Sequence, residues 1–117
     1  MSVKEPRDGR IRRIQQLLND EPLDRLTLHG LAKSVNLSLS RAQHLFKQET
    51  GVSLGQHLND LRMKKAQNLL ETSFLSVKEI TAQVGWASQS KFGRDFRACF
   101  GMSPAKYRSQ IKSTPPA

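Results

Sequence analysis

Residues 84–108, VGWASQSKFGRDFRACFGMSPAKYR, place three phenylalanines and three cations between two glycines. At about 100° per residue, a helix through this run puts Phe92, Phe96 and Cys99 on one side. The other side then carries small, polar and cationic residues, namely Ser90, Gly93, Arg94 and Arg97, with Lys91 at its flank. The pattern predicts an amphipathic helix over residues 88–100 that packs on its aromatic side and exposes the other.

The composition favours a polyanionic partner. The chain of 117 residues has 19 Lys and Arg against 10 Asp and Glu, which gives a net charge of +9. Nucleic acid is the first candidate for such a chain, and a membrane surface is the second. The single cysteine excludes an internal disulfide, and no apolar run resembles a signal peptide or a membrane span. We therefore expect a soluble, cytoplasmic protein of one domain or two very small ones.

Helical periodicity and its punctuation predict an all-α fold of seven helices without strands. The first helix contains Ile11 and stops before Pro22, and the second starts at the capping residue Thr27. The others are expected over residues 38–51, 54–71, from 76, over 88–100, and from 103. Ser76 and Glu79 have the spacing of a capping box. Flexible ends are expected at residues 1–9 and 113–117.

The chain repeats itself at an interval of about fifty residues. Residues 26–35, LTLHGLAKSV, align with residues 75–84, LSVKEITAQV, at an offset of 49. After the turn the offset becomes 50, and the pairs are Ser38 with Ser88, Phe46 with Phe96, Gly51 with Gly101 and Ser53 with Ser103. Two copies of a short helix, a tight turn and a longer basic helix indicate a duplicated helix-turn-helix. The alternative is a chance alignment of two ordinary amphipathic helix pairs.

The third predicted helix carries a polar stripe at the same place in the repeat as the sixth. Its apolar side holds Ala42, Leu45 and Phe46, and its outward side holds Ser40, Gln43, His44 and Lys47. A helix fits the major groove, where Arg can bridge O6 and N7 of guanine and Gln can pair with adenine. One such stripe is typical of any solvated helix, whereas two matching stripes in a chain of charge +9 favour DNA reading.

These residues carry a family resemblance. Residues 80–108, ITAQVGWASQSKFGRDFRACFGMSPAKYR, resemble the second helix-turn-helix signature of the AraC/XylS transcription regulators. Residues 31–73, LAKSVNLSLSRAQHLFKQETGVSLGQHLNDLRMKKAQNLLETS, resemble the first motif and the connecting helix of that family. The resemblance covers residues 9–112. Two residues depart from it. Phe or Tyr is commoner than tryptophan at the position of Trp86, and glycine is unusual inside a recognition helix, where Gly93 lies.

The resemblance implies a sequence-specific transcription regulator with two helix-turn-helix subdomains, over residues 10–52 and 73–112, joined by a connecting helix over residues 53–72. Each subdomain would insert one recognition helix into a major groove. The positions that match the family's DNA-binding residues are Ser40, Arg41, Gln43, His44 and Lys47 in the first subdomain and Gln89, Ser90, Lys91, Arg94 and Arg97 in the second. Lys47 and Arg97 are expected at phosphates and the others at base edges. The helical wheel alone places Gln89 toward the side of its helix.

The expected partner is double-stranded DNA, bound by a monomer at an asymmetric site, and RNA polymerase is a further candidate partner. The protein would then be associated with the nucleoid. No membrane partner and no cofactor are expected. An enzyme is not predicted, because there is no glycine-rich phosphate loop, no cluster of metal ligands and no nucleophile beside a base. The rival class is a basic architectural or surface-binding protein without sequence specificity.

Several residues have structural interpretations. Cys99, Tyr107, Leu54 and Leu58 are expected in the core, and Trp86 is expected to fill the turn of the second motif. For Arg62 a buried ion pair is favoured over a DNA contact. Gly93 fits either a close approach to DNA or drift at an exposed site.

The extent of the protein is open at this point. The chain is either a short stand-alone regulator, which its beginning at Met1 favours, or the DNA-binding end of a longer protein. The operator, the target genes and the choice between activation and repression are also open.

Overall fold

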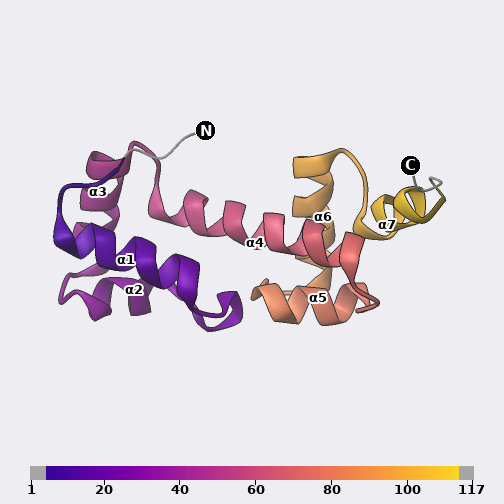
Figure 1. The fold of residues 1–117 in the computed structure, drawn as a ribbon, viewed down its shortest axis with the longest axis horizontal. Helices are drawn as coiled ribbons and strands as arrows, with labels where there is room; N and C mark the ends of the chain where they lie inside the picture. Colours follow the sequence, from indigo (N-terminus) through magenta and orange to yellow (C-terminus); the bar gives the residue numbers. More distant parts are fainter. Residues whose placement is uncertain (1–4, 114–117) are drawn as a thin grey trace. The chain divides into compact units, whose positions relative to one another are not determined.

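The computed structural model describes residues 5–113, and the surroundings of side chains up to residue 111. Within this part of the chain it contains seven α-helices, one 3-10 helix and no strand, as predicted for the fold class. The elements in order are α1 (Gly9–Asp20), η1 (Leu23–Arg25), α2 (Leu28–Ser34), α3 (Leu39–Thr50), α4 (Leu54–Thr72), α5 (Val77–Val84), α6 (Gln89–Phe100) and α7 (Pro104–Ser113) (Figure 1). Only the short η1 was not predicted.

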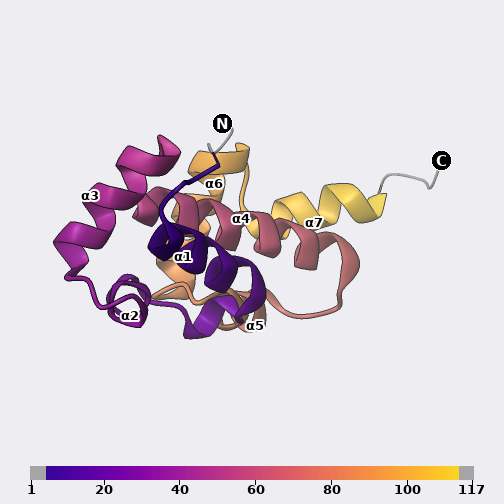
Figure 2. The same cartoon turned by 60° about the vertical axis from the view of Figure 1, so that its left-hand side comes forward.

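The chain divides into two compact units, one ending at Leu61 and the other beginning at Arg62. The first unit holds α1, η1, α2, α3 and the start of α4, and the second holds the rest of α4 with α5, α6 and α7 (Figure 2). The boundary lies inside α4, so this helix contributes to both units.

Side-chain caps fix the starts of the helices. The hydroxyl oxygens of Thr27, Ser38 and Ser88 accept hydrogen bonds from the backbone N–H group of the third residue of α2, α3 and α6, respectively. Ser76 and Glu79 form the predicted capping box at α5. Gly51, Gly85 and Gly101 end α3, α5 and α6 with φ angles of 86°, 79° and 82°, which favour glycine. The caps predicted at Thr27 and Ser76 are therefore confirmed.

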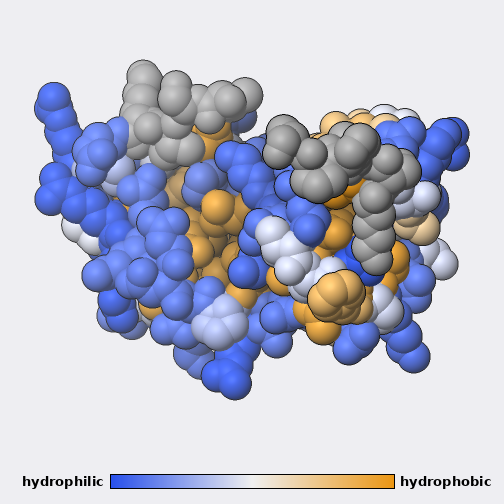
Figure 3. Space-filling view, turned by 45° about the vertical axis from the view of Figure 1, so that its right-hand side comes forward, coloured by the Kyte–Doolittle hydropathy of each residue, from blue (hydrophilic) through white to orange (hydrophobic). Residues whose placement is uncertain are grey.

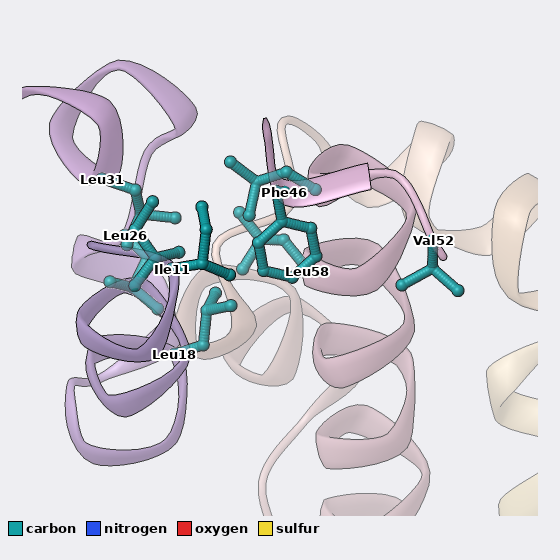
Figure 4. Packing of buried hydrophobic residues seen from close by; sticks show 9 residues of the cluster. Ile11, Leu18, Leu26, Leu31, Phe46, Val52 and Leu58 are labelled. Carbon is teal, nitrogen blue, oxygen red and sulfur yellow. The ribbon is translucent and has the colours of Figure 1, made fainter. Parts of the chain in front are cut away.

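The first core is built around Phe46, whose side chain is fully buried. Its members come from four helices and the segments between them, and they are Ile11, Ile14, Leu18, Leu26, Leu31, Phe46, Val52, Leu54 and Leu58 (Figure 4). Leu54 and Leu58 lie in the core as predicted. Because Ala42 and Phe46 of α3 are both buried, the opposite side of α3 must face solvent.

The second core is aromatic. Phe92 and Phe96 are fully buried, and Trp86, Phe100 and Tyr107 pack against the same cluster. The ring of Phe96 lies 4.4 Å from that of Phe100 and 5.6 Å from that of Tyr107, measured between centroids. Phe46 and Phe96, paired by the repeat, thus occupy equivalent core positions in the two units.

The prediction that Cys99 is a core thiol is wrong, because the structure exposes it. Tyr107 of α7 packs on the side of α6 that carries Phe96 and Phe100. Cys99 lies about 100° around the helix from Phe100, where that packing does not reach.

The predicted flexible arm over residues 1–9 contains ordered structure at its end. Gly9 is the first residue of α1, Asp8 caps that helix, and Pro6 is buried. A carboxylate oxygen of Glu49, in α3, accepts hydrogen bonds from the backbone N–H groups of Arg7 at 3.0 Å and Asp8 at 2.7 Å. Residues 5–9 therefore belong to the first unit. Residues 1–4 of the arm and 114–117 of the tail lie outside the described residues.

Arg108 joins α7 to the end of α4. Its guanidinium donates to the backbone carbonyls of Leu69 and Leu70, in the last turn of α4, and to those of Ser73 and Leu75 beyond it. The Leu69 carbonyl also accepts hydrogen bonds from the backbone N–H and the hydroxyl of Ser73, so Arg108 adds a charged donor to a helix end where carbonyls have few partners within the helix. The hydroxyl of the neighbouring Tyr107 donates a hydrogen bond to Glu71 of α4. This hydrogen bond is the main reason that the pKa of Tyr107 is raised.

Replacement of Arg108 by alanine is expected to destabilise the second unit by about 1–3 kcal/mol, because several carbonyls lose a charged donor at once. Trp86 is the only tryptophan in the chain and lies in the second unit, so its fluorescence during thermal unfolding reports on this unit. Arg108→Lys keeps the charge without the planar fork and should recover little of the loss. Full stability of Arg108→Lys would show that the charge alone is what matters.

Candidate nucleic-acid interface

The exposed side of α3 carries all five residues that the sequence selected in the first unit. Ser40, Arg41, Gln43, His44 and Lys47 are exposed, whereas Ala42 and Phe46 on the other side are buried. A shallow hollow lies beside this face, lined by Gln43, His44, Lys47, Gln48, Ser53, Leu54 and Gly55. The structure therefore brings Gln43, His44 and Lys47 together with the start of α4, and leaves Ser40 and Arg41 on the exposed helix outside the hollow.

The exposed side of α6 forms a second hollow. It is lined by Gln89, Ser90, Gly93, Arg94, Arg97 and Ser103. Gln89, which the helical wheel placed toward the side, is exposed and shares this surface with Arg94. The structure thus groups four of the five residues selected in the second unit.

The two hollows are equivalent in the repeat. At the offset of 50, Lys47 corresponds to Arg97, His44 to Arg94 and Ser53 to Ser103. Each of these serines caps the helix that follows: the Ser53 hydroxyl oxygen accepts from the Gln56 N–H at 3.1 Å, and that of Ser103 from the Lys106 N–H at 3.2 Å. We call these the first and second reading surfaces.

Sequence reasoning did not assign Gln48, Ser53 or Ser103 to the site. The pairing of Ser53 with Ser103 in the repeat was the signal that could have found two of them. The places of Ser53 and Ser103 follow from the turns at Gly51 and Gly101, which direct the start of the next helix to the side of α3 and of α6, whereas Gln48 lies on α3 itself.

Lys91 stands apart from the second reading surface. Its ammonium lies 3.3 Å from a carboxylate oxygen of Asp95, one turn along α6. The same carboxylate oxygen accepts a hydrogen bond from the indole N–H of Trp86 at 3.0 Å. Trp86 also packs edge-on against Phe92, so it fills the turn between α5 and α6 as predicted.

The pKa of Asp95 is lowered from its ordinary value, first by the hydrogen bond from Trp86 and then by the hydrogen bond and charge of Lys91. Asp95 is therefore a structural anion that joins the turn to the flank of α6. Because Asp95 offsets the positive charge of the Lys91 ammonium, Lys91 attracts an external phosphate less strongly.

Arg62 lies on α4 at the start of the second unit. Its guanidinium is half-buried, and burial lowers its pKa. The ion pair proposed for it stays a prediction.

The surface is polar, consistent with the net charge of +9, and hydrophilic residues cover much of the face drawn in Figure 3. No helix within residues 5–113 is long and apolar enough to span a membrane. In the same part of the chain, no three His, Cys, Asp or Glu side chains gather in a way that could hold a metal ion.

The arrangement of two helix-turn-helix units matches a known family. Residues 31–110 match the model of a helix-turn-helix domain. The chain belongs to the AraC/XylS family. Its relatives are transcription regulators and not enzymes: it is 31% identical over 103 residues to the Msm operon regulatory protein of Streptococcus mutans and 34% identical over 109 residues to the arabinose operon regulatory protein of Escherichia coli. These alignments cover 88% and 92% of the chain, but the chain spans only 37% of the length of each relative.

Solved AraC-type DNA-binding domains share the fold. The C-terminal domain of AraT, a response regulator from Geobacillus stearothermophilus, is 31% identical, with a TM-score of 0.79 and coverage of 94% of each chain. The DNA-binding domain of AdpA, a global transcriptional factor solved with a target DNA, is 29% identical, with a TM-score of 0.78 and coverage of 91% of this chain and 95% of that one. The all-α double helix-turn-helix is thus shown for this AraC-family chain.

The lowered pKa of Asp95 gives the AraC-family domain a testable acid sensitivity. A carboxyl whose pKa is lower in the folded state stabilises the fold above its unfolded value, about 3.9, and loses this contribution as the pH falls through the folded value. Asp95→Asn keeps a hydrogen-bond acceptor for Trp86 but does not titrate. We expect the melting temperature of the second unit to fall less between pH 6 and pH 3 in Asp95→Asn than in the wild type, when followed by Trp86 fluorescence. Parallel curves would contradict a role for this carboxylate.

Proposed function

We propose that this chain binds double-stranded DNA at specific sequences and regulates transcription, with α3 and α6 as its recognition helices. The observation that carries the proposal is the presence of two equivalent reading surfaces, each on the exposed side of a helix whose other side is locked by a buried phenylalanine. The DNA complex of the AdpA domain, 29% identical to this chain, supports it. So do relatives named as operon regulators and as transcriptional activators, which also favour RNA polymerase as a further partner.

Base reading is assigned to exposed residues in the first two turns of α3 and α6. Arg94 can bridge O6 and N7 of a guanine, and Gln43 and Gln89 can each pair with an adenine. Ser40, Arg41, His44 and Ser90 would read neighbouring base edges. Lys47 and Arg97, one turn further along α3 and α6, are assigned to phosphates. Lys91 is the weakest member of this set, because Asp95 holds its ammonium.

The division into two subdomains and a connecting helix, over residues 10–52, 73–112 and 53–72, is part of the proposal. The 19 residues of α4 extend about 28 Å at a rise of ~1.5 Å per residue. One turn of DNA advances about 34 Å, so a monomer with a continuous α4 suits half-sites about one turn apart. Because the sequences of α3 and α6 differ, the site should be asymmetric.

Arg94→Ala is expected to weaken binding to the cognate site by about 1–3 kcal/mol and to relax preference at one base pair. Lys47→Ala should weaken cognate and random duplexes alike and lower the salt dependence by about one counterion. Both follow from the different places of these residues on the reading surfaces. The measurement is fluorescence anisotropy over a range of salt, with a duplex obtained by binding-site selection on the purified chain and a scrambled duplex.

Lys78→Ala is the matched control for loss of a charge, because Lys78 is exposed on α5 and lines neither surface. Equal losses for Arg94→Ala on both duplexes would remove Arg94 from the base-reading residues. A wild-type chain that binds both duplexes equally at every salt concentration would instead identify a basic architectural protein.

Spacing between the half-sites provides an independent test. Insertion of about 5 bp, half a turn, places the second half-site on the opposite side of the duplex, and a stiff α4 cannot follow it. Gel shifts should then show loss of most of the specific affinity. Insertion of a full turn is the control, because it keeps both half-sites on the same side of the duplex and changes only the distance between them. Undiminished binding to the half-turn insertion would indicate flexibly tethered units. An obligate complex of two chains on a palindrome would exclude the monomer mechanism.

A further inference from the structure

Gly93 has no evident function within the protein. It is the fifth residue of α6, in the interior of the helix, where glycine is unfavourable relative to alanine. It is not among the residues of positive φ. A Cβ atom built at Gly93 would meet nothing within 4 Å, whereas one at Gly30 would come within 2.9 Å of the Thr27 hydroxyl oxygen. Neither backbone geometry nor packing requires glycine here.

The missing side chain shapes the second reading surface. Gly93 lies between Gln89 and Arg97, each one turn away on the same side of α6, and these residues share the hollow with Arg94. In the first reading surface the equivalent position is Gln43, whose side chain lines the corresponding hollow. The repeat therefore places a long amide on one surface where the other surface has bare backbone.

We propose that the hollow over Gly93 receives the C5 methyl group of a thymine, so that Gly93 determines sequence specificity by its lack of a side chain. This inference rests on the proposed function and names one base that the second reading surface selects.

The chemistry of the hollow favours a methyl group over a phosphate. Gly93 lines the hollow with bare backbone, and nothing lies within 4 Å of the place where a Cβ atom would stand, so there is room for a group of methyl size. The backbone N–H groups in the interior of α6 are engaged in helical hydrogen bonds, so they offer no donors to an anion. The thymine methyl is the apolar group that projects from a base edge into the major groove. Arg94 and Arg97, which also line the hollow, supply the donors for a neighbouring guanine or phosphate.

The test removes a methyl group from the DNA and, separately, adds one to the protein at Gly93. In the half-site whose base preference Arg94→Ala relaxes, each thymine of the selected duplex is replaced in turn by deoxyuridine, which lacks only the methyl. The wild type should lose about fourfold in affinity at one of these positions, from the methyl left unburied. Gly93→Ala should bind the thymine duplex about tenfold more weakly than the wild type, as for a mismatched base pair. Gly93→Ala should bind the duplex with deoxyuridine at that position as tightly as the wild type binds the thymine duplex, because the alanine methyl then fills the space that the thymine methyl has left.

Gly93→Ala should also melt several degrees higher than the wild type, because alanine favours the helix and nothing obstructs its Cβ. Weaker binding by a more stable protein separates an effect on recognition from an effect on folding. Ala98→Gly is the matched control, since Ala98 is exposed on α6 about 140° around the helix from Gly93. It should lower the melting temperature and leave the thymine-to-deoxyuridine ratio unchanged.

Unaltered affinity of Gly93→Ala for the thymine duplex would overturn the inference, and so would a loss that no deoxyuridine restores. Either result leaves the proposed function intact if Arg94→Ala still relaxes a base preference. A wild type without preference for the selected duplex over a scrambled one would contradict the proposed function itself, so the two failures are distinguishable.

Discussion

The burial of one phenylalanine in each unit sets the direction in which each recognition helix faces. Phe46 and Phe96 are fully buried at equivalent positions of the repeat, and each forms part of the core of its unit. Because a helix is a rigid cylinder of side chains, the position of one buried ring determines the angle of every other residue on it. The exposed sides of α3 and α6, and the hollows beside them, depend on this single constraint.

The two units reach the same arrangement with different supporting contacts. In the first, Glu49 of α3 binds the backbone just before α1. In the second, Arg108 of α7 binds the end of α4, and Trp86 joins the turn to Asp95 of α6. The core and the glycines that end α3 and α6 are common to both copies, whereas the turn residue of positive φ is Asn36 in the first copy and Gly85 in the second, and the polar contacts are particular to each. This pattern agrees with a duplication in which packing was retained while the surface diverged.

Much of this architecture could be predicted from local signals. Thr27 and Ser76 were identified as caps because their hydrogen bonds reach only a few residues along the chain. The reading surfaces could be found in part, because helical periodicity places His44 opposite Phe46 and Arg94 opposite Phe96. Contacts between distant residues were not accessible: nothing near Arg108 or Glu49 in the sequence indicates their partners some forty residues away. Cys99 was misplaced for the same reason, since periodicity gives the side of a helix but not the neighbour that covers it.

The continuity of α4 across the boundary between the units has an evolutionary consequence. An inserted or deleted residue near Leu61 and Arg62 would turn everything beyond it by about 100° and shift it by about 1.5 Å along the helix axis, if α4 remained helical. On the proposed function, the operators available to the protein would change while every side chain proposed to read bases stayed the same. If the two surfaces bind DNA as proposed, new binding sites could therefore arise through a change in the length of one helix, without any change in the residues of the two surfaces.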